Sequence, residues 1–323
     1  MYKNDISKYS KNYRIAILIP CYNESATIAT VISDFRNILS DADIYVCDNN
    51  SNDGTAQIAE AAGAIVMYES RKGKGYAVRR LLHEVDADLF ILVDGDSTYY
   101  ANELPKLISE IILKKAFMVV GVRRPIDPKG SFRPLHQLGN KLITKIINLL
   151  FNTNLTDVLS GYRVLSRNYA KVVPFLSRGF EIETEMTLHA LEFDLQISEI
   201  PVSYGSRPQQ SISKLSTYRD GLLIFKTIFS IFRDCRPMLF FGTASLMLIF
   251  AGLLLGIPVI MDFYKTGMVG RFPTAILAAS LELLAFQMIG VGLVLETMAR
   301  QRRFFQQFWL KHFGTDSPSH IES

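Results

Sequence analysis

Hydrophobic and polar positions in the N-terminal part of the chain alternate in blocks that predict strands and helices in turn. Short apolar runs have the length of buried strands, and longer stretches with apolar residues at helical spacing follow them. The expected strands are 14–19, 43–47, 64–67, 89–93 and 117–122, and the expected helices are 25–39, 56–62, 76–84 and 103–114. This order favours an α/β fold with a doubly wound, mostly parallel sheet.

The C-terminal third has a different pattern. No residue from Pro237 to Met261 is charged, and a second apolar run, Phe272–Leu295, is interrupted only by Glu282. About 20 apolar residues are enough for a helix to cross a bilayer. The two runs therefore predict a transmembrane hairpin with spans at 237–261 and 272–297.

Basic residues are more frequent outside this hairpin than in its connector. Lys226, Arg233, Arg236, Arg300, Arg302 and Arg303 flank it, against Lys265 and Arg271 in the connector. The positive-inside rule then places both termini and the N-terminal domain in the cytoplasm. We expect a multi-pass protein of the plasma (inner) membrane of a bacterium or archaeon.

The chain is therefore expected to have five segments. They are an N-terminal tail (1–12), an α/β domain (13–215), amphipathic juxtamembrane helices (216–236), the transmembrane hairpin (237–299) and a basic cytoplasmic tail (300–323). In the juxtamembrane segment, apolar and charged residues alternate at a spacing suited to a helix that lies in the membrane interface.

Composition narrows the possible functions only a little. A net charge of +4 over 323 residues gives no indication of a nucleic-acid partner. The three cysteines, Cys21, Cys47 and Cys235, form no Cys-x-x-Cys pair, which argues against a zinc site or a disulfide framework. The polar N-terminus has no apolar core of a signal peptide.

Polar clusters follow the expected strands, and the clearest is Asp94-Gly95-Asp96 after the strand 89–93. Residues i and i+2 of an extended chain point to the same side, so both carboxylates can face one ligand. At the carboxyl end of a parallel strand, such a pair suits Mg²⁺ or Mn²⁺ carrying phosphate oxygens. Alone, the same three residues are more often a solvated turn.

Two further clusters favour the ligand interpretation. Asp48, at the end of the strand 43–47, can accept hydrogen bonds from a nucleobase edge or ribose hydroxyls. Lys74, between Gly73 and Gly75 at the start of a helix, suits a phosphate. The sequence has neither a Walker A loop nor a Rossmann fingerprint, which leaves little support for a kinase or a dehydrogenase. Together the clusters predict a nucleotide-diphosphate site.

Four of these segments resemble, in order and spacing, the pattern of glycosyltransferase family 2 on a GT-A fold. They are 20–24, 48–55, 73–75 and 94–96. The segments 157–163, 179–186 and 213–215 are similar to those of polyprenyl-phosphate glycosyltransferases related to dolichyl-phosphate mannose synthase, and the resemblance covers about 15–227. It implies transfer of a hexose from a nucleotide diphosphate-sugar to an undecaprenyl or dolichyl phosphate, with inversion and with Mg²⁺ or Mn²⁺ as cofactor.

The resemblance also implies which residues form the site. Asp96 and Asp94 would hold the metal, and the catalytic residues would be Asp96, Arg123 and Arg133. The nucleotide-sugar-binding residues would be Pro20, Tyr22, Glu24, Asp48, Ser51, Lys74, Asp94, Asp96 and Glu185. The acceptor phosphate would be bound by Arg123, Arg133, Ser160, Arg163, Arg207 and Lys214, although Gln210 stands where relatives often have glycine.

Three acidic residues are candidates for the side chain that accepts a hydrogen bond from a hydroxyl of the sugar. Glu181, Glu183 and Glu185 alternate before a helix that runs to Phe193, and at this spacing they cannot all share one helix face. Glu185 is the one that matches the position in the family.

An acceptor phosphate needs no general base, because its second pKa of roughly 6 leaves it largely ionised at neutral pH. A UDP-sugar, glucose or N-acetylglucosamine, is the favoured donor, because 94–99 reads Asp-Gly-Asp-Ser-Thr-Tyr instead of the Asp-Ala-Asp common in mannose synthases. The alternatives are a GDP-mannose-dependent dolichyl-phosphate mannose synthase, a family 2 enzyme that extends a lipid-linked glycan, and an inactive membrane scaffold. A homo-oligomer is compatible with each.

Overall fold

The computed structural model describes residues 12–126, 134–179, 181–206, 226 and 229–313. The chain divides into two compact units, Met1–Ile224 with Gln306–Ser323, and Phe225–Phe305. Most of the expected juxtamembrane segment 216–236 lies outside the described residues.

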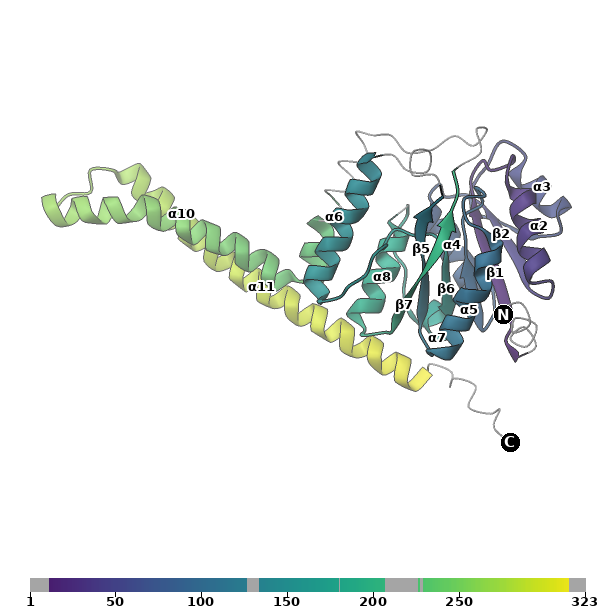
Figure 1. Cartoon of the computed structure of the whole chain (residues 1–323). Helices are drawn as coiled ribbons and strands as arrows, with labels where there is room; N and C mark the ends of the chain where they lie inside the picture. Colours follow the sequence, from purple (N-terminus) through teal and green to yellow (C-terminus); the bar gives the residue numbers. More distant parts are fainter. Residues whose placement is uncertain (1–11, 127–133, 180, 207–225, 227–228, 314–323) are drawn as a thin grey trace. The chain divides into compact units, whose positions relative to one another are not determined.

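The first unit is built on a seven-stranded mixed sheet with the order β3-β2-β1-β4-β6-β5-β7 (Figure 1). The strands are β1 (Ile15–Cys21), β2 (Asp43–Asp48), β3 (Ile65–Tyr68), β4 (Leu89–Leu92), β5 (Met118–Pro125), β6 (Arg163–Ser166) and β7 (Ile197–Tyr204). Strand β6 runs antiparallel to both of its neighbours, and the other strands share one direction. The expected mostly parallel sheet is confirmed.

Helices cover both faces of this sheet (Figure 1). They are α2 (Ile28–Ile38), α3 (Thr55–Ala61), α4 (Lys74–Glu84), η1 (Ala101–Glu103), α5 (Leu104–Leu113), α6 (Pro134–Phe151), α7 (Arg167–Val172) and α8 (Ile182–Glu192). Alternate residues of β1 point to opposite faces. Ile17 and Ile19 pack with α2 and α5 in one core, and Ala16 and Leu18 pack with α4, α7 and α8 in the other.

Strand β7 is not among the strands expected from the sequence. Pro201 falls inside it, and proline normally argues against a strand because it cannot donate a ladder hydrogen bond. In the structure β7 is an edge strand, paired only with β5 within the sheet, where Pro201 lies opposite Val122. At an edge the missing donor breaks no ladder.

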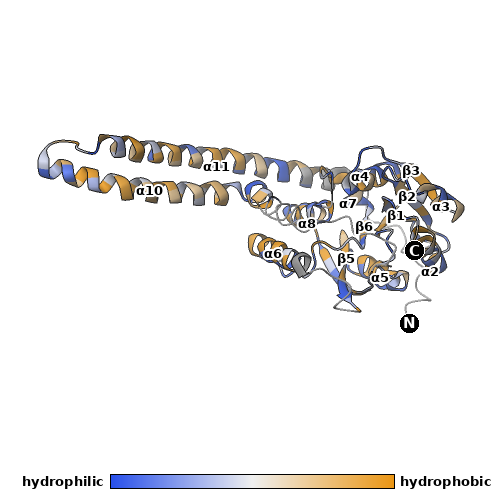
Figure 2. Ribbon diagram, turned by 90° about the horizontal axis from the view of Figure 1, so that it is seen from above, coloured by the Kyte–Doolittle hydropathy of each residue, from blue (hydrophilic) through white to orange (hydrophobic). Residues whose placement is uncertain are grey.

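The second unit consists of two long helices, α10 (Pro237–Thr266) and α11 (Phe272–Phe313), and α11 continues into the first unit. By length and composition, 237–266 and 272–305 are candidate membrane spans, both longer than the expected spans. Figure 2 shows hydrophobic residues along most of both helices.

Small residues line the contact between α10 and α11. Ser245, Gly252 and Val259 of α10 are seven residues apart, and so are Ala278 and Ala285 of α11; Ser245 and these two alanines are buried. The Ser245 hydroxyl donates to the Ala285 carbonyl at 2.9 Å. A seven-residue repeat keeps the same face of each helix toward its partner along the hairpin.

Candidate functional site

The polar loops that follow β1, β2 and β4 come together at one edge of the sheet because these strands are adjacent and parallel. Each loop contains a residue in the left-handed region, Asn23 (φ 53°), Asn50 (φ 66°) and Ser97 (φ 59°). Asparagine tolerates this conformation, whereas it is uncommon for serine. Backbone strain of this kind is concentrated at functional sites.

The loops after β1 and β2 are hydrogen-bonded to each other. The Asn23 amide donates to Ser51 Oγ, the Asn52 amide to Asn23 Oδ1 and the Glu24 amide to Thr55 Oγ1, each at 2.9 Å. Of the residues expected to bind the nucleotide-sugar, Ser51 and Glu24 therefore help to hold the loops together.

Asp48 is the last residue of β2 and is 5% exposed. Its Oδ2 accepts a hydrogen bond from the Ser51 amide at 3.1 Å. Its Oδ1 is buried and has no hydrogen-bond partner within the described part of the chain. A buried carboxylate oxygen without a donor is costly, so this atom indicates where a ligand donor would bind.

Pro20 and Tyr22 are the predicted nucleotide-sugar-binding residues at the end of β1 and directly after it. Pro20 lies within β1, opposite Cys47 of β2. The Tyr22 ring is half-buried, and the Lys72 ammonium lies 5.6 Å from its centroid.

Asn49 has a role that the sequence interpretation missed. Its Nδ2 donates to the carbonyls of Glu69 (3.1 Å) and Arg71 (2.7 Å), and its Oδ1 accepts from the Gly73 amide at 2.7 Å. Asn49 thus fixes the loop that leads to Lys74. Its position beside Asp48 in the 48–55 motif was the available signal.

Gly73 and Gly75 allow a close approach of two backbone segments. Gly73 has φ 141° and ψ 131°, and a Cβ there would overlap the Arg178 carbonyl oxygen. A Cβ at Gly75 would overlap the Ser177 carbonyl oxygen. The two glycines are needed because the segment 177–178 packs directly on this loop.

Lys74 lies between two carboxylates. Its ammonium is 2.5 Å from Asp94 Oδ1 and also contacts the Glu183 carboxylate, and its side chain is 11% exposed. Burial lowers the pKa of Lys74, but the charges of Asp94 and Glu183 outweigh that effect and raise it above the ordinary value. The lysine is therefore a cation in the cluster.

The acid beside Lys74 is Glu183, not Glu185. The Glu185 carboxylate instead accepts from the backbone amides of Leu176 (2.8 Å) and Ser177 (2.9 Å). Both acids lie in the first turn of α8, where residues two apart are about 200° apart around the axis and face different ways. Glu185 thus anchors the segment 176–177, and its expected contact with the sugar stays a prediction.

Asp96 is 2% exposed and fixed by its own loop. Its Oδ1 accepts from the Thr98 amide (3.1 Å) and hydroxyl (2.5 Å). Asp94 packs against Gly161, where a Cβ would lie 2.6 Å from Asp94 Oδ2. Of the two predicted metal ligands, Asp94 also pairs with Lys74, and Asp96 follows it two residues later in the same loop.

The described residues contain no group of three or more His, Cys, Asp or Glu side chains that could enclose a metal ion. Mg²⁺ usually keeps several waters and is held by one or two carboxylates together with substrate phosphates. Asp96 and Asp94 fit that kind of metal site, in which the substrate supplies the other ligands.

Arg123, at the end of β5, forms a bidentate pair with Asp157. Its Nε is 2.7 Å from Oδ2 and its Nη2 2.8 Å from Oδ1 of Asp157. Asn140 Nδ2 donates to the same carboxylate at 3.0 Å. Burial raises the pKa of Asp157, but the hydrogen bonds and positive charge of Arg123, together with the hydrogen bond from Asn140, outweigh it and hold the pKa below its usual range.

Ser160 and Arg163, both expected to bind the acceptor phosphate, are fully buried. Arg163 donates to the carbonyls of Ser160 (2.8 Å) and Val158 (2.7 Å) and to the Thr187 hydroxyl (3.0 Å). Ser160 Oγ donates to the Gly121 carbonyl at 2.6 Å. This is a correction: both side chains hold the loop 157–161 from inside the protein.

Arg133, Arg207 and Lys214 lie outside the described residues.

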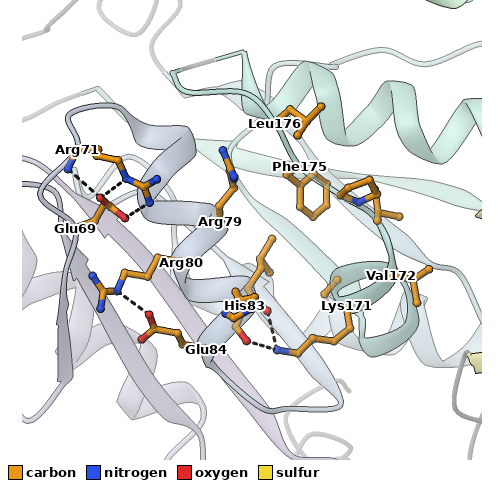
Figure 3. Close-up of a pocket in the computed structure, with 14 residues that line it drawn as sticks. Glu69, Arg71, Arg79, Arg80, His83, Glu84, Lys171, Val172, Phe175 and Leu176 are labelled. Atoms are coloured by element: carbon orange, nitrogen blue, oxygen red, sulfur yellow. Dashed lines mark hydrogen bonds and ion pairs between the residues drawn. The ribbon is translucent and has the colours of Figure 1, made fainter.

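A cavity of about 670 Å³ lies elsewhere, between α4 and the segment 170–176 (Figure 3). Arg71 pairs with Glu69 and Arg80 with Glu84 in its wall. Lys171 donates to the Leu82 carbonyl at 2.7 Å. No predicted site residue lines this cavity, and most of its charges are already paired.

Comparisons with known proteins bear on this site. A sequence model described as "Glycosyl transferase family 2" matches residues 16–173. "Glycosyltransferase AglJ" of Haloferax volcanii is 34% identical over 232 residues, which are 72% of this chain and 76% of that protein. The "Dolichyl-phosphate hexose transferase" of the same organism is 25% identical over 66% of this chain and 92% of that protein.

Among solved structures, glucosyl-3-phosphoglycerate synthase from Mycobacterium tuberculosis, in complex with Mn²⁺ and uridine-diphosphate-glucose, superposes with a TM-score of 0.58. The match covers 72% of this chain and 82% of that one at 22% identity. At this identity, the likeness concerns the fold.

Proposed function

Because the chain belongs to glycosyltransferase family 2, with a GT-A fold, we propose that it transfers a hexose from a nucleotide diphosphate-sugar to a polyprenyl phosphate. The donor we favour is UDP-glucose or UDP-N-acetylglucosamine. The acceptor is an undecaprenyl or dolichyl phosphate, used at the cytoplasmic face of the membrane.

The observation that carries the proposal is the cluster of Asp48, Lys74, Asp94 and Asp96 around the ends of β2 and β4 and the start of α4. We assign the unpaired Oδ1 of Asp48 to a donor group of the nucleoside. Lys74 is a buried cation, and the diphosphate of the donor can bind it by competing with the carboxylates that pair with it.

Asp96 is the residue we assign to a divalent cation, with Asp94 beside it. The cation, Mg²⁺ or Mn²⁺, would neutralise charge on the diphosphate when bound. The Mn²⁺ in the complex of the mycobacterial synthase supports the use of a divalent cation.

Arg123 is the described residue we assign to the acceptor. Asp157 fixes its guanidinium, which gives a phosphate a preorganised partner. One acceptor oxygen forms a bond to the anomeric carbon while the bond from that carbon to the diphosphate breaks. The oxygen attacks from the face opposite the diphosphate and UDP leaves with the electron pair, so this single displacement would invert the configuration. The relative named as a dolichyl-phosphate hexose transferase supports a lipid acceptor.

The two candidate spans support a membrane location, and the basic residues on their outer flanks favour cytoplasmic termini. The acceptor would then be present in the same bilayer as α10 and α11.

The test is incorporation of labelled sugar into a chloroform-soluble product. The purified chain, polyprenyl phosphate and Mg²⁺ or Mn²⁺ are incubated with a panel of UDP- and GDP-sugars, with and without EDTA. We expect lipid-linked label from a UDP-hexose and none with EDTA. If label came only from GDP-mannose, the proposed UDP-hexose donor would be wrong. If label appeared only in a lipid-linked glycan, the proposed polyprenyl-phosphate acceptor would be wrong.

A pair of isosteric substitutions on α8 separates the two acids. We expect Glu183→Gln to lower kcat/KM about tenfold or more, because Lys74 loses one of its two anionic partners and is then positioned by Asp94 alone. Glu185→Gln removes an acceptor from the 176–177 backbone, so it should lower Tm while changing the rate less than about threefold. A larger rate effect at Glu185 than at Glu183 would reverse this assignment.

A further inference from the structure

Tyr204, the last residue of β7, lies beside Arg123, the residue assigned to the acceptor. In the parallel ladder of β5 and β7, Arg123 pairs with Val202, and Tyr204 follows two residues later. Paired residues, and residues two apart on one strand, point to the same face of a sheet, so Tyr204 and Arg123 emerge on one side. The guanidinium carbon of Arg123 lies over the Tyr204 ring, 5.7 Å from its centroid. At this distance the electron-rich face of the ring attracts the cation.

The ring is a partner of a different kind from Asp157, which binds Nε and Nη2 of the same guanidinium. An arginine side chain has N–H donors on all three of its nitrogens, and a phosphate is bound through such donors. Asp157 takes up donors, whereas an aromatic face attracts the cation without using any. Tyr204 can therefore hold the guanidinium in place and leave its donors to other ligands.

The end of β7 is also joined to the loop after β4, which carries Asp96. Tyr204 and Tyr99 form an antiparallel β-bridge, and their rings meet edge to face with centroids 5.1 Å apart. The Gly205 amide donates to the Thr98 carbonyl at 2.9 Å. Thr98 is buried and binds Asp96 Oδ1 with its amide and its hydroxyl. Tyr204 thus connects the acceptor side with the loop of the cation site.

The Tyr204 hydroxyl adds a side-chain link to the same loop, because it hydrogen-bonds with the side chain of Thr98. Thr98 gives its own hydroxyl hydrogen to Asp96, so Tyr204 is the donor in this bond. Burial and the charge of Asp96 raise the pKa of Tyr204, and the charge of Arg123 offsets them only in part. The phenol is therefore neutral at physiological pH and keeps its hydrogen.

We propose that Tyr204 is a positioning residue, which holds the Arg123 guanidinium at a fixed place relative to the loop that carries Asp96. The ring acts on the guanidinium, and the β-bridge and the hydroxyl attach the ring to that loop. The inference rests on the proposed function in one respect, the acceptor phosphate as the ligand of Arg123.

The fixed position matters because the proposed reaction joins two phosphate-bearing substrates. The cation site would hold the diphosphate that leaves, and Arg123 the phosphate that attacks. The attacking oxygen has to reach the anomeric carbon in line with the bond that breaks, so the spacing of the two sites controls the rate. A misplacement of about 1 Å in such an arrangement can cost on the order of 100-fold in rate.

The first experiment measures the position of Arg123 without any substrate. The full chain in nanodiscs is treated with phenylglyoxal, which modifies guanidinium groups, and mass spectrometry gives the rate at each arginine. We expect Tyr204→Leu to raise the rate at Arg123 about fivefold, because the attraction of the ring is lost. Tyr204→Phe keeps the ring and should stay within about twofold of the unsubstituted chain. The internal control is Arg14, exposed just before β1 at the other end of that strand, whose rate should not change.

The second experiment separates the two substrates kinetically. Tyr204→Leu should raise KM for polyprenyl phosphate about fivefold or more and leave KM for the UDP-hexose within about twofold. Tyr204→Phe should restore KM for the acceptor, because the ring is present again. The same variant lacks the bond to Thr98, so its kcat should fall about threefold or more through looser spacing of the two sites.

Packing is the alternative role, because Tyr204 also lies against the core on its side of the sheet. A lower Tm of Tyr204→Leu with equal changes in both KM values would show that role and overturn the inference. So would an unchanged rate of modification at Arg123. An unaltered kcat of Tyr204→Phe would refute the link to the cation loop. If the unsubstituted chain transfers no sugar to lipid, the proposed function fails, and the rate at Arg123 still decides whether Tyr204 positions this arginine.

Discussion

Asp96→Asn is expected to lower kcat/KM for sugar transfer about 1000-fold, which is a loss of roughly 4 kcal/mol of transition-state stabilisation. The substitution removes the charge that we assign to the divalent cation. It keeps an oxygen in place of Oδ1, which accepts from the Thr98 amide and hydroxyl, so the loop after β4 should keep its structure. The measurement is initial rate at saturating polyprenyl phosphate over a range of Mn²⁺ concentrations.

Asp34→Asn is the control for loss of one negative charge, because Asp34 is exposed on α2 and lies outside the loops that form the site. It should transfer sugar at the unsubstituted rate. If Asp96→Asn retains more than about a tenth of the activity with unchanged Mn²⁺ dependence, Asp96 does not hold the cation.

Gly73→Ala is expected to destabilise the first unit by about 3 kcal/mol or more and to abolish donor binding. Two effects add: a backbone conformation open almost only to glycine, and overlap of the new Cβ with the Arg178 carbonyl oxygen. Relief would require moving the loop that Asn49 holds and that carries Lys74. Thermal unfolding in detergent and calorimetric titration with UDP would measure the two consequences.

Gly54→Ala separates these two effects. Gly54 also has a positive φ, 85°, but its Cβ would meet no atom closer than 3.9 Å. We expect a cost of about 1 kcal/mol from the backbone conformation alone. Equal destabilisation by the two alanines would show that the contact between 73–75 and 177–178 contributes nothing.

The loops at the strand ends could be predicted because each one depends only on residues that are adjacent in the sequence. The runs before Asp48 and Asp94 are short and apolar, and the polar residues follow at once. Adjacent parallel strands end at the same edge of a sheet. Once the end of each strand is located in the sequence, the polar residues that follow are therefore predicted to lie close together.

The acceptor side could not be predicted in the same way, because side-chain direction there depends on packing. Sequence gives no sign that Arg163 turns inward to the Val158 carbonyl, since buried arginine is rare. The choice between Glu183 and Glu185 depended on where α8 begins, and a shift of one or two residues changes which acid faces Lys74.

The hydrogen bonds between the loops after β1 and β2 affect how the nucleotide would bind. The backbone amides of Asn23 and Glu24 donate to the hydroxyls of Ser51 and Thr55 without any ligand. The conformational entropy of these two loops is therefore lost when the chain folds, not when the nucleotide arrives. Calorimetry of UDP binding should accordingly show a small entropic penalty, and hydrogen exchange at these amides should already be slow in the free protein.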